Sequence, residues 1–160
     1  MDILLRGGPV MGVLALFSVF FLALIFYCRG EYGRLRNPRG PYREKINALM
    51  EEGETPEEAF DEVSYPLRRG IAWLSHLANL STLLGLLGTV LGVHNAFREL
   101  EAAREVSMKI FAGGIHQAVL TTIVGLSLAI PALIGHYFFR DKFSRIEARI
   151  LKDILKRMDS

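Results

Sequence analysis

The residues with the clearest chemical potential are hydroxyls set in apolar sequence. Thr89 lies in the run 71–97, which contains no Lys, Arg, Asp or Glu, and Thr122 lies in a second such run, 110–139. A hydroxyl at mid-membrane depth can hydrogen-bond a water or the ionisable group of a partner, where lipid offers nothing. The simpler interpretation is that such hydroxyls only help helices to pack.

Histidine is the other residue type in these runs that could carry a proton. His116 stands beside Gln117, and imidazole titrates near neutral pH, so His116 is a possible proton relay. The alternative is a polar residue in a helix interface or near the outer membrane boundary. The four histidines show no H-x-x-x-H or His-carboxylate pairing, so we expect no metal site.

Enzymatic chemistry is not indicated. Ser127 and His136 are nine positions apart on one expected helix, too far for a nucleophile and its base to touch. No oxyanion hole or second polar helix is visible. We therefore expect no catalytic residue and no cofactor.

Composition places the chain among integral membrane proteins. It has 160 residues, 51% of them hydrophobic, and the apolar residues gather in three blocks separated by charged segments. The formal net charge of +2 is too small to suggest a nucleic-acid partner. The single cysteine, Cys28, excludes an internal disulfide and a Cys-based metal site, and we expect it at a helix end.

The three apolar blocks are each long enough to cross a bilayer as a helix. They cover Pro9–Tyr27, 71–97 and 110–139, and a helix of about 27 residues spans about 40 Å against about 30 Å of hydrocarbon. A signal peptide is the competing interpretation of the first block. The block is longer than a usual h-region and ends without a small-residue cleavage site, so we expect a retained helix.

The second and third spans each carry a stripe of small and weakly polar residues at helical spacing. In the second span these are Ala78, Ser81, Thr82, Gly85, Gly88, Thr89 and Gly92; in the third they are Gly114, Ala118, Thr121, Thr122, Gly125, Ala129 and Ala132. Small residues let helices approach closely, and Gly88 to Gly92 is a GxxxG motif. We therefore predict a closely packed helical hairpin, bent at Pro131.

The segment 30–70 is polar. Its sequence around Pro38 and Pro41 cannot continue a helix. A short helix is predicted from Tyr42 to Glu52, ended by Gly53, and a second one starts at a capping box in which Thr55 is the N-cap and Glu58 closes the box. We expect these two short helices to form a small soluble layer with a solvated acidic face.

After Arg140 the apolar positions Phe143, Ile146, Ile150, Ile154 and Met158 alternate with Lys and Arg. This spacing predicts an amphipathic helix that extends the third span into water. Basic residues gather in 30–70 and in the tail 140–160, so the positive-inside rule places the N-terminus outside and the C-terminus in the cytoplasm. The expected segments are 1–29 (outside segment and first span), 30–70 (cytoplasmic), 71–139 (hairpin) and 140–160 (cytoplasmic helix), with 98–109 as a charged connector.

Three sequence stretches together resemble the ExbB/TolQ/MotA proton-channel family, closest to its ExbB and TolQ branch. They are Gly7-Gly8-Pro9-Val10 before the first span, LLGLLGTV from Leu83 in the second, and GI at Gly114 with TTIVGL from Thr121 and AIPA from Ala129 in the third. The resemblance implies a homopentameric ring in the bacterial inner membrane, with a pore lined by the second and third spans. It also implies an ExbD/TolR-type single-span partner whose Asp carries the proton, and a TonB/TolA-type energy transducer beyond it.

By this resemblance Thr89 and Thr122 are the pore hydroxyls that face the partner's Asp. The wider pathway set adds Gln117, Thr121 and Ser81, and the packing set is Gly85, Gly88, Gly92, Gly114, Gly125 and Pro131. The family pattern usually has a Glu where this chain has Gln117. Because no Asp or Glu lies in the three runs, the proton-carrying acid must come from another chain.

The predicted function is therefore that of a proton-channel or stator subunit, which converts proton motive force into mechanical work on an envelope machine. The alternative is a non-conducting membrane scaffold that binds a partner helix through the same small-residue faces. Proton flux with and without the partner separates the two.

Overall fold

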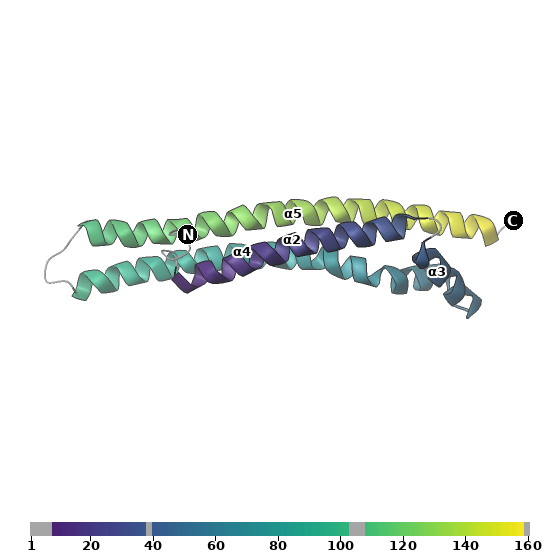
Figure 1. Cartoon of the computed structure of the whole chain (residues 1–160), viewed down its shortest axis with the longest axis horizontal. Coiled ribbons are helices and arrows are strands. Elements are labelled where there is room, and N and C mark those ends of the chain that lie inside the picture. Colours follow the sequence, from purple (N-terminus) through teal and green to yellow (C-terminus); the bar gives the residue numbers. More distant parts are fainter. Residues whose placement is uncertain (1–7, 38–39, 103–107, 159–160) are drawn as a thin grey trace. The chain divides into compact units, whose positions relative to one another are not determined.

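A computed structural model describes residues 8–37, 40–102 and 108–158, and the described part is helical. Its helices are α2 (Gly8–Arg36), α3 (Pro41–Glu51), α4 (Pro56–Ala102) and α5 (Met108–Met158) (Figure 1). Three of them, α2, α4 and α5, are long and apolar enough to cross a membrane. The prediction of an all-α protein with three candidate spans is confirmed.

Many large apolar side chains on the long helices are exposed on the surface of the chain. In α4, Leu83, Leu86 and Val90 are each about three-fifths exposed, and Ile123 and Ile130 of α5 are similarly open. A water-soluble protein rarely leaves such a surface uncovered. In a bilayer the same side chains can face lipid or other helices, so the exposed leucines agree with three membrane spans.

The first helix is longer than the apolar block that predicts it. It continues past Arg29 to Arg36 and ends before Asn37, and α3 then begins with Pro41 at its first position. The predicted break between these helices is therefore confirmed. Cys28 lies inside α2 and is buried, so the expectation that it stands at a helix end is wrong. Gly7, part of the motif before the first span, lies outside the described residues.

The turn between α3 and α4 has the predicted chemistry. Gly53, just after α3, has φ +101°, a left-handed conformation that glycine adopts without strain. At the start of α4 the Glu58 N–H donates to the Thr55 hydroxyl (3.3 Å), and the Thr55 N–H donates to the Glu58 carboxylate (3.1 Å). The Thr55 hydroxyl also donates to the Glu58 carboxylate (2.7 Å), and this bond, followed by the one from the Thr55 N–H, lowers the pKa of Glu58 below its usual value. The capping box is confirmed.

The helix that starts at this box is not short. It runs without interruption through Pro66 and Gly70 to Ala102, so the predicted second short helix and the second span are one helix, α4. Gly70 acts as a packing residue, because a Cβ there would lie 3.0 Å from Cys28 Sγ and 3.2 Å from the Tyr27 ring. The glycine accommodates α2 and does not end the helix.

Two compact units share the long helices. The first unit combines the chain up to Leu22 with Ser75–Leu133, and the second combines Ala23–Leu74 with Ile134–Ser160. In the first unit the partly buried Phe21 packs on a core of Ala78, Ala129 and Ala132.

The core of the second unit is larger and aromatic. The Phe60 and Phe143 rings lie 5.9 Å apart, and Ile46 of α3 is also buried. The predicted amphipathic helix is confirmed as the continuation of α5, with Phe143, Ile146, Ile150 and Ile154 all buried. The Met158 side chain and connector residues 103–107 lie outside the described part.

Candidate functional site

The two small-residue stripes meet along one line in the first unit. Gly85 of α4 faces Gly125 of α5, Gly92 faces Ala118, and Ala96 faces Gly114. As residue numbers rise along α4 they fall along α5, so the two helices are antiparallel. The contact is therefore a helical hairpin in which small side chains face one another.

The approach at this line is closer than most side chains allow. A Cβ at Gly125 would lie 2.6 Å from the Ser81 carbonyl oxygen and 2.9 Å from Gly85 Cα. A Cβ at Gly92 would lie 2.7 Å from Ala118 Cβ, and one at Gly88 would lie 2.6 Å from Thr121 Cβ. Backbones this close gain van der Waals contact, which drives helix association where no hydrophobic effect operates between helices.

Thr89 and Thr122 meet across this hairpin. Their hydroxyls are hydrogen-bonded to each other, and the Thr122 hydroxyl also approaches the Gly85 carbonyl oxygen at 3.0 Å. Thr89 Oγ1 lies 3.2 Å from the same oxygen and 3.4 Å from the Ala118 carbonyl oxygen. Both side chains are only partly buried, so one side of the pair is open to a further chain.

The pair has spare acceptor capacity. Each hydroxyl carries one proton and two lone pairs. If one threonine donates to the other, and the second donates to the Gly85 carbonyl, the first keeps both of its lone pairs. A protonated acid or a water brought to the open side of Thr89 and Thr122 therefore finds an acceptor. This arrangement can hold a proton donor at a depth where lipid cannot.

The other two hydroxyls of the predicted pathway lie differently. Thr121 is 1% exposed and donates to the Ala118 carbonyl of its own helix at 2.7 Å. Ser81 is fully buried, and its hydroxyl has no hydrogen-bond partner among the described residues. Within one chain both side chains are enclosed between α4 and α5, whereas Thr89 and Thr122 reach the edge of that contact.

The remaining predicted site residues lie on α5. His116 is exposed and Gln117, directly before Ala118, is half-buried, and neither side chain makes a hydrogen bond within the described part of the chain. Pro131 is exposed and lies inside α5, which continues through it as one helix. Gln117 is thus on the same helix as Thr122 and is partly accessible.

Backbone carbonyls are the part of this site that sequence analysis missed. Gly85 and Ala118 supply the oxygens around the threonine pair. Every residue has a carbonyl, so composition cannot single these out. The one available signal was the spacing of Gly85 and Thr89, which are four positions apart, so that the threonine can reach back to the glycine carbonyl.

Comparison with known proteins gives the family. The model of the MotA/TolQ/ExbB proton channel family matches residues 39–152, which is more than half of the chain. The chain belongs to this family. The resemblance to this family is thereby confirmed, with the second and third spans inside the matched range, and the protein is a helical membrane protein of the ExbB/TolQ type.

Three curated relatives of this family share parts of the sequence. The Tol-Pal system protein TolQ of Pseudomonas aeruginosa is 32% identical over 134 residues, covering 72% of this chain and 55% of the relative. The TolQ of Haemophilus influenzae is 36% identical over 70 residues, covering 44% and 31%. The biopolymer transport protein ExbB of Salmonella typhimurium is 32% identical over 82 residues, covering 51% and 34%. The chain thus spans from about a third to just over half of these relatives.

Proposed function

We propose that this ExbB/TolQ-type protein is the channel subunit of a proton-driven motor in the bacterial inner membrane. The observation that carries the proposal is the Thr89–Thr122 pair, which joins α4 to α5 and keeps an open acceptor side. The family of the chain is described as a proton channel family. Copies of the hairpin would form a ring, a pentamer by analogy with the family, with this side toward the pore.

A partner must supply the acid. The runs 71–97 and 110–139 contain no Asp or Glu, and Gln117 cannot carry a proton as a Glu does. A single-span partner of the TolR or ExbD type, with an Asp in its helix, would place that carboxyl group against Thr89 and Thr122. A TolA- or TonB-type transducer would then receive the work.

The mechanism uses electrostatics and no covalent chemistry. The protonated acid of the partner donates a hydrogen bond to the free lone pairs of the threonine pair and is held there as a neutral group. Loss of the proton leaves a carboxylate with nothing to donate to these lone pairs, so the contact weakens and the partner can move past the pair. Each charge that crosses the membrane potential supplies about 2.3 kcal/mol per 100 mV, enough to bias one such step.

The roles within the predicted pathway set then divide by accessibility. Thr89, Thr122 and Gln117 would line the path, and Ser81 and Thr121 would hold α4 against α5 together with Gly85, Gly88, Gly92, Gly114 and Gly125. His116 is exposed near one end of the hairpin and is proposed as a relay only if protons enter there. The N-terminus would lie outside, with segments 30–70 and 140–160 in the cytoplasm.

The direct test is proton flux in liposomes under an imposed gradient, with the purified protein alone and together with its single-span partner. We expect flux only when both are present. A complex that assembles and never conducts would support the scaffold alternative.

A second experiment uses Gln117→Glu. If Gln117 lines the path, the variant restores the family's acid and shifts the pH dependence of partner-dependent flux. In a lipid-facing position the new carboxyl group would only weaken membrane insertion, as seen in the amount of protein recovered from membranes.

A further inference from the structure

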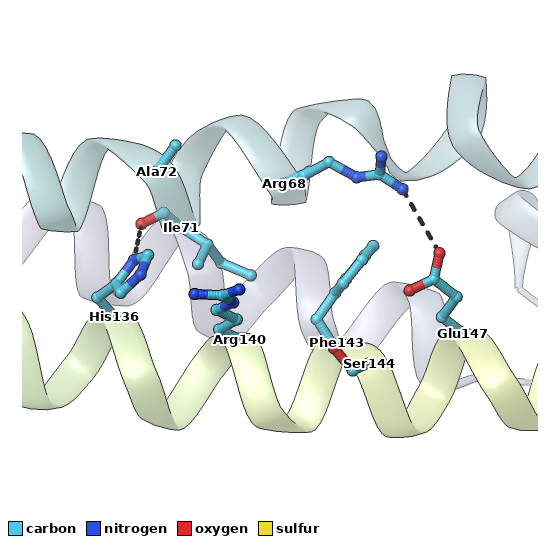
Figure 2. Close-up of a pocket in the computed structure, with 8 residues that line it drawn as sticks. All are labelled: Arg68, Ile71, Ala72, His136, Arg140, Phe143, Ser144 and Glu147. Carbon is cyan, nitrogen blue, oxygen red and sulfur yellow. Dashed lines mark hydrogen bonds and ion pairs between the residues drawn. The ribbon is translucent and has the colours of Figure 1, made fainter.

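A cavity of about 330 Å³ opens between α4 and α5 in the second unit. Figure 2 shows Arg68 and Ile71 of α4 facing His136, Arg140 and Phe143 of α5. The cavity lies where both apolar runs end, because Arg140 directly follows the run 110–139 and Ile71 begins the run 71–97. The cavity is lined by both apolar and charged side chains.

The two arginines of the cavity differ in their ion pairing. Arg68 is already paired, with its guanidinium 2.5 Å from the Asp61 carboxylate and 3.6 Å from that of Glu147. Arg140 forms no ion pair within the described part of the chain, and Figure 2 shows its side chain between His136 and Phe143. A guanidinium beside apolar walls favours an anion with an apolar part.

His136 adds a directional polar group. Its Nδ1 lies 2.8 Å from the Ile71 carbonyl oxygen, which can only accept, so Nδ1 carries the proton. In the neutral ring Nε2 is then the acceptor, suited to a hydroxyl of the bound molecule. The Ser144 hydroxyl at the rim adds a further polar group.

We propose that this cavity binds the phosphodiester headgroup of an anionic phospholipid. The phosphate would lie on Arg140, a headgroup hydroxyl on His136 Nε2, and the start of the acyl chains along Ile71 and Ala72, toward the apolar runs. The cavity lies at the ends of the apolar runs, which is the depth of the lipid headgroups in a bilayer. Basic pockets between membrane helices at this depth bind anionic lipids. The proposal rests on the chain crossing a membrane and is independent of proton conduction.

The test titrates the purified full-length protein in detergent with short-chain phosphatidylglycerol and, separately, phosphatidylcholine, counting bound lipid per chain by native mass spectrometry. We expect wild type to prefer phosphatidylglycerol, and Arg140→Gln to lower that preference about fivefold, the effect of one cation near the membrane surface. Arg29→Gln is the matched control, since Arg29 also follows an apolar run but lies outside the cavity, and it should leave the preference unchanged.

A second variant leaves Arg140 in place. Ser144→Asp puts a negative charge at the exposed rim and should also lower the preference, while Ser144→Asn should not. The proposal is overturned if Arg140→Gln and Ser144→Asp both keep the wild-type preference for phosphatidylglycerol. It is also overturned if Arg29→Gln lowers this preference as much as Arg140→Gln does. Displacement of the lipid by an equal concentration of inorganic phosphate would also overturn it, because the acyl chains would then contribute nothing.

Discussion

The two units of this protein hold the same long helices together by different chemistry. In the first unit α4 and α5 touch through glycine, alanine and threonine, with backbone atoms in direct contact. In the second unit the contacts are rings and ion pairs, such as Phe60 with Phe143 and Arg68 with Glu147. The difference follows from the surroundings expected for each: lipid offers no hydrophobic drive between helices, whereas water offers one and also solvates charges.

The short helix α3 illustrates the second kind of packing. It buries Ile46 and makes one polar contact to each long helix: Tyr42 to Glu31 of α2, Lys45 to Glu62 of α4, and Arg43 to Asp153 of α5. Glu31 is only 8% exposed and also accepts from Arg34 at 3.1 Å. The second unit thus uses ion pairs between helices, Lys45 with Glu62 and Arg43 with Asp153.

The largest expected effect tests the close packing of the first unit. Gly125→Leu places a side chain against Ser81 O and Gly85 Cα, which are backbone atoms that cannot move aside. We expect the α4–α5 hairpin and the assembly built on it to be lost, measured by size-exclusion chromatography and thermal unfolding in detergent. The matched control is Gly113→Leu, also on α5, where a Cβ meets nothing within 4 Å. Equal stability of the two variants would contradict the proposed contact.

A smaller effect is expected from the α3 contact in the second unit. Tyr42→Phe removes the hydroxyl that donates to the buried Glu31 carboxylate, at an expected cost of about 1–3 kcal/mol in the free energy of unfolding. The lower part of that range is expected because Arg34 stays bonded to Glu31. Tyr65→Phe, at an exposed tyrosine, should cost almost nothing. Chemical denaturation in detergent compares the variants, and equal losses would show that the Glu31 contact contributes no stability.

The same contact predicts a pH dependence. Burial, and the Glu31 carboxylate that accepts the phenol proton, raise the pKa of Tyr42 to about 12. The folded protein then keeps the proton that the unfolded chain releases near its ordinary pKa of about 10. The stability from this group is therefore complete below about pH 10 and is lost as the pH rises toward 12. A phenolate absorbance titration of wild type minus Tyr42→Phe should show this late step, and a midpoint near 10 would contradict it.

The smallest effect is local to the start of α4. Thr55→Ala removes the N-cap hydroxyl and should cost about 1 kcal/mol. The Thr55 donors lower the pKa of Glu58. The stability that this lowered pKa provides is complete above the usual pKa of Glu58 and is lost as the pH falls through the lowered value. The stability difference between wild type and Thr55→Ala should therefore shrink in acid. A difference that stays constant down to strongly acidic pH would argue against the capping box.

Much of this fold could be predicted from local sequence rules. The three spans follow from apolar length, the start of α4 from Thr55 and Glu58, and the buried face of the α5 extension from the spacing of Phe143, Ile146 and Ile150. The continuity of α4 was harder to predict. The sequence predicts a short helix in 30–70 separate from the second span, and only the contact of Gly70 with Cys28 of α2 shows that a packing glycine lies inside one long helix.

The candidate site was likewise predicted in part. The stripes identify every hydroxyl near the α4–α5 contact, because helical spacing determines which residues share a face. They cannot separate Ser81 and Thr121, which are enclosed, from Thr89 and Thr122, which reach the edge. That distinction depends on the rotation of one helix against the other, which arises from the packing of both stripes.

The measurement that most directly tests the account is partner-dependent proton flux through Thr89→Val and Thr122→Val in liposomes. Valine keeps the shape and removes the hydroxyl, and an interhelical hydrogen bond in a membrane averages only about 0.6 kcal/mol, so assembly should survive. We predict that flux falls at least about fivefold in each variant, the loss expected from about 1 kcal/mol of missing hydrogen bonding to the partner's acid. Thr82→Val, at an exposed threonine bonded to the Ala78 carbonyl of its own helix, should conduct as wild type does. Wild-type flux from both Thr89→Val and Thr122→Val would remove the threonine pair from the proton path.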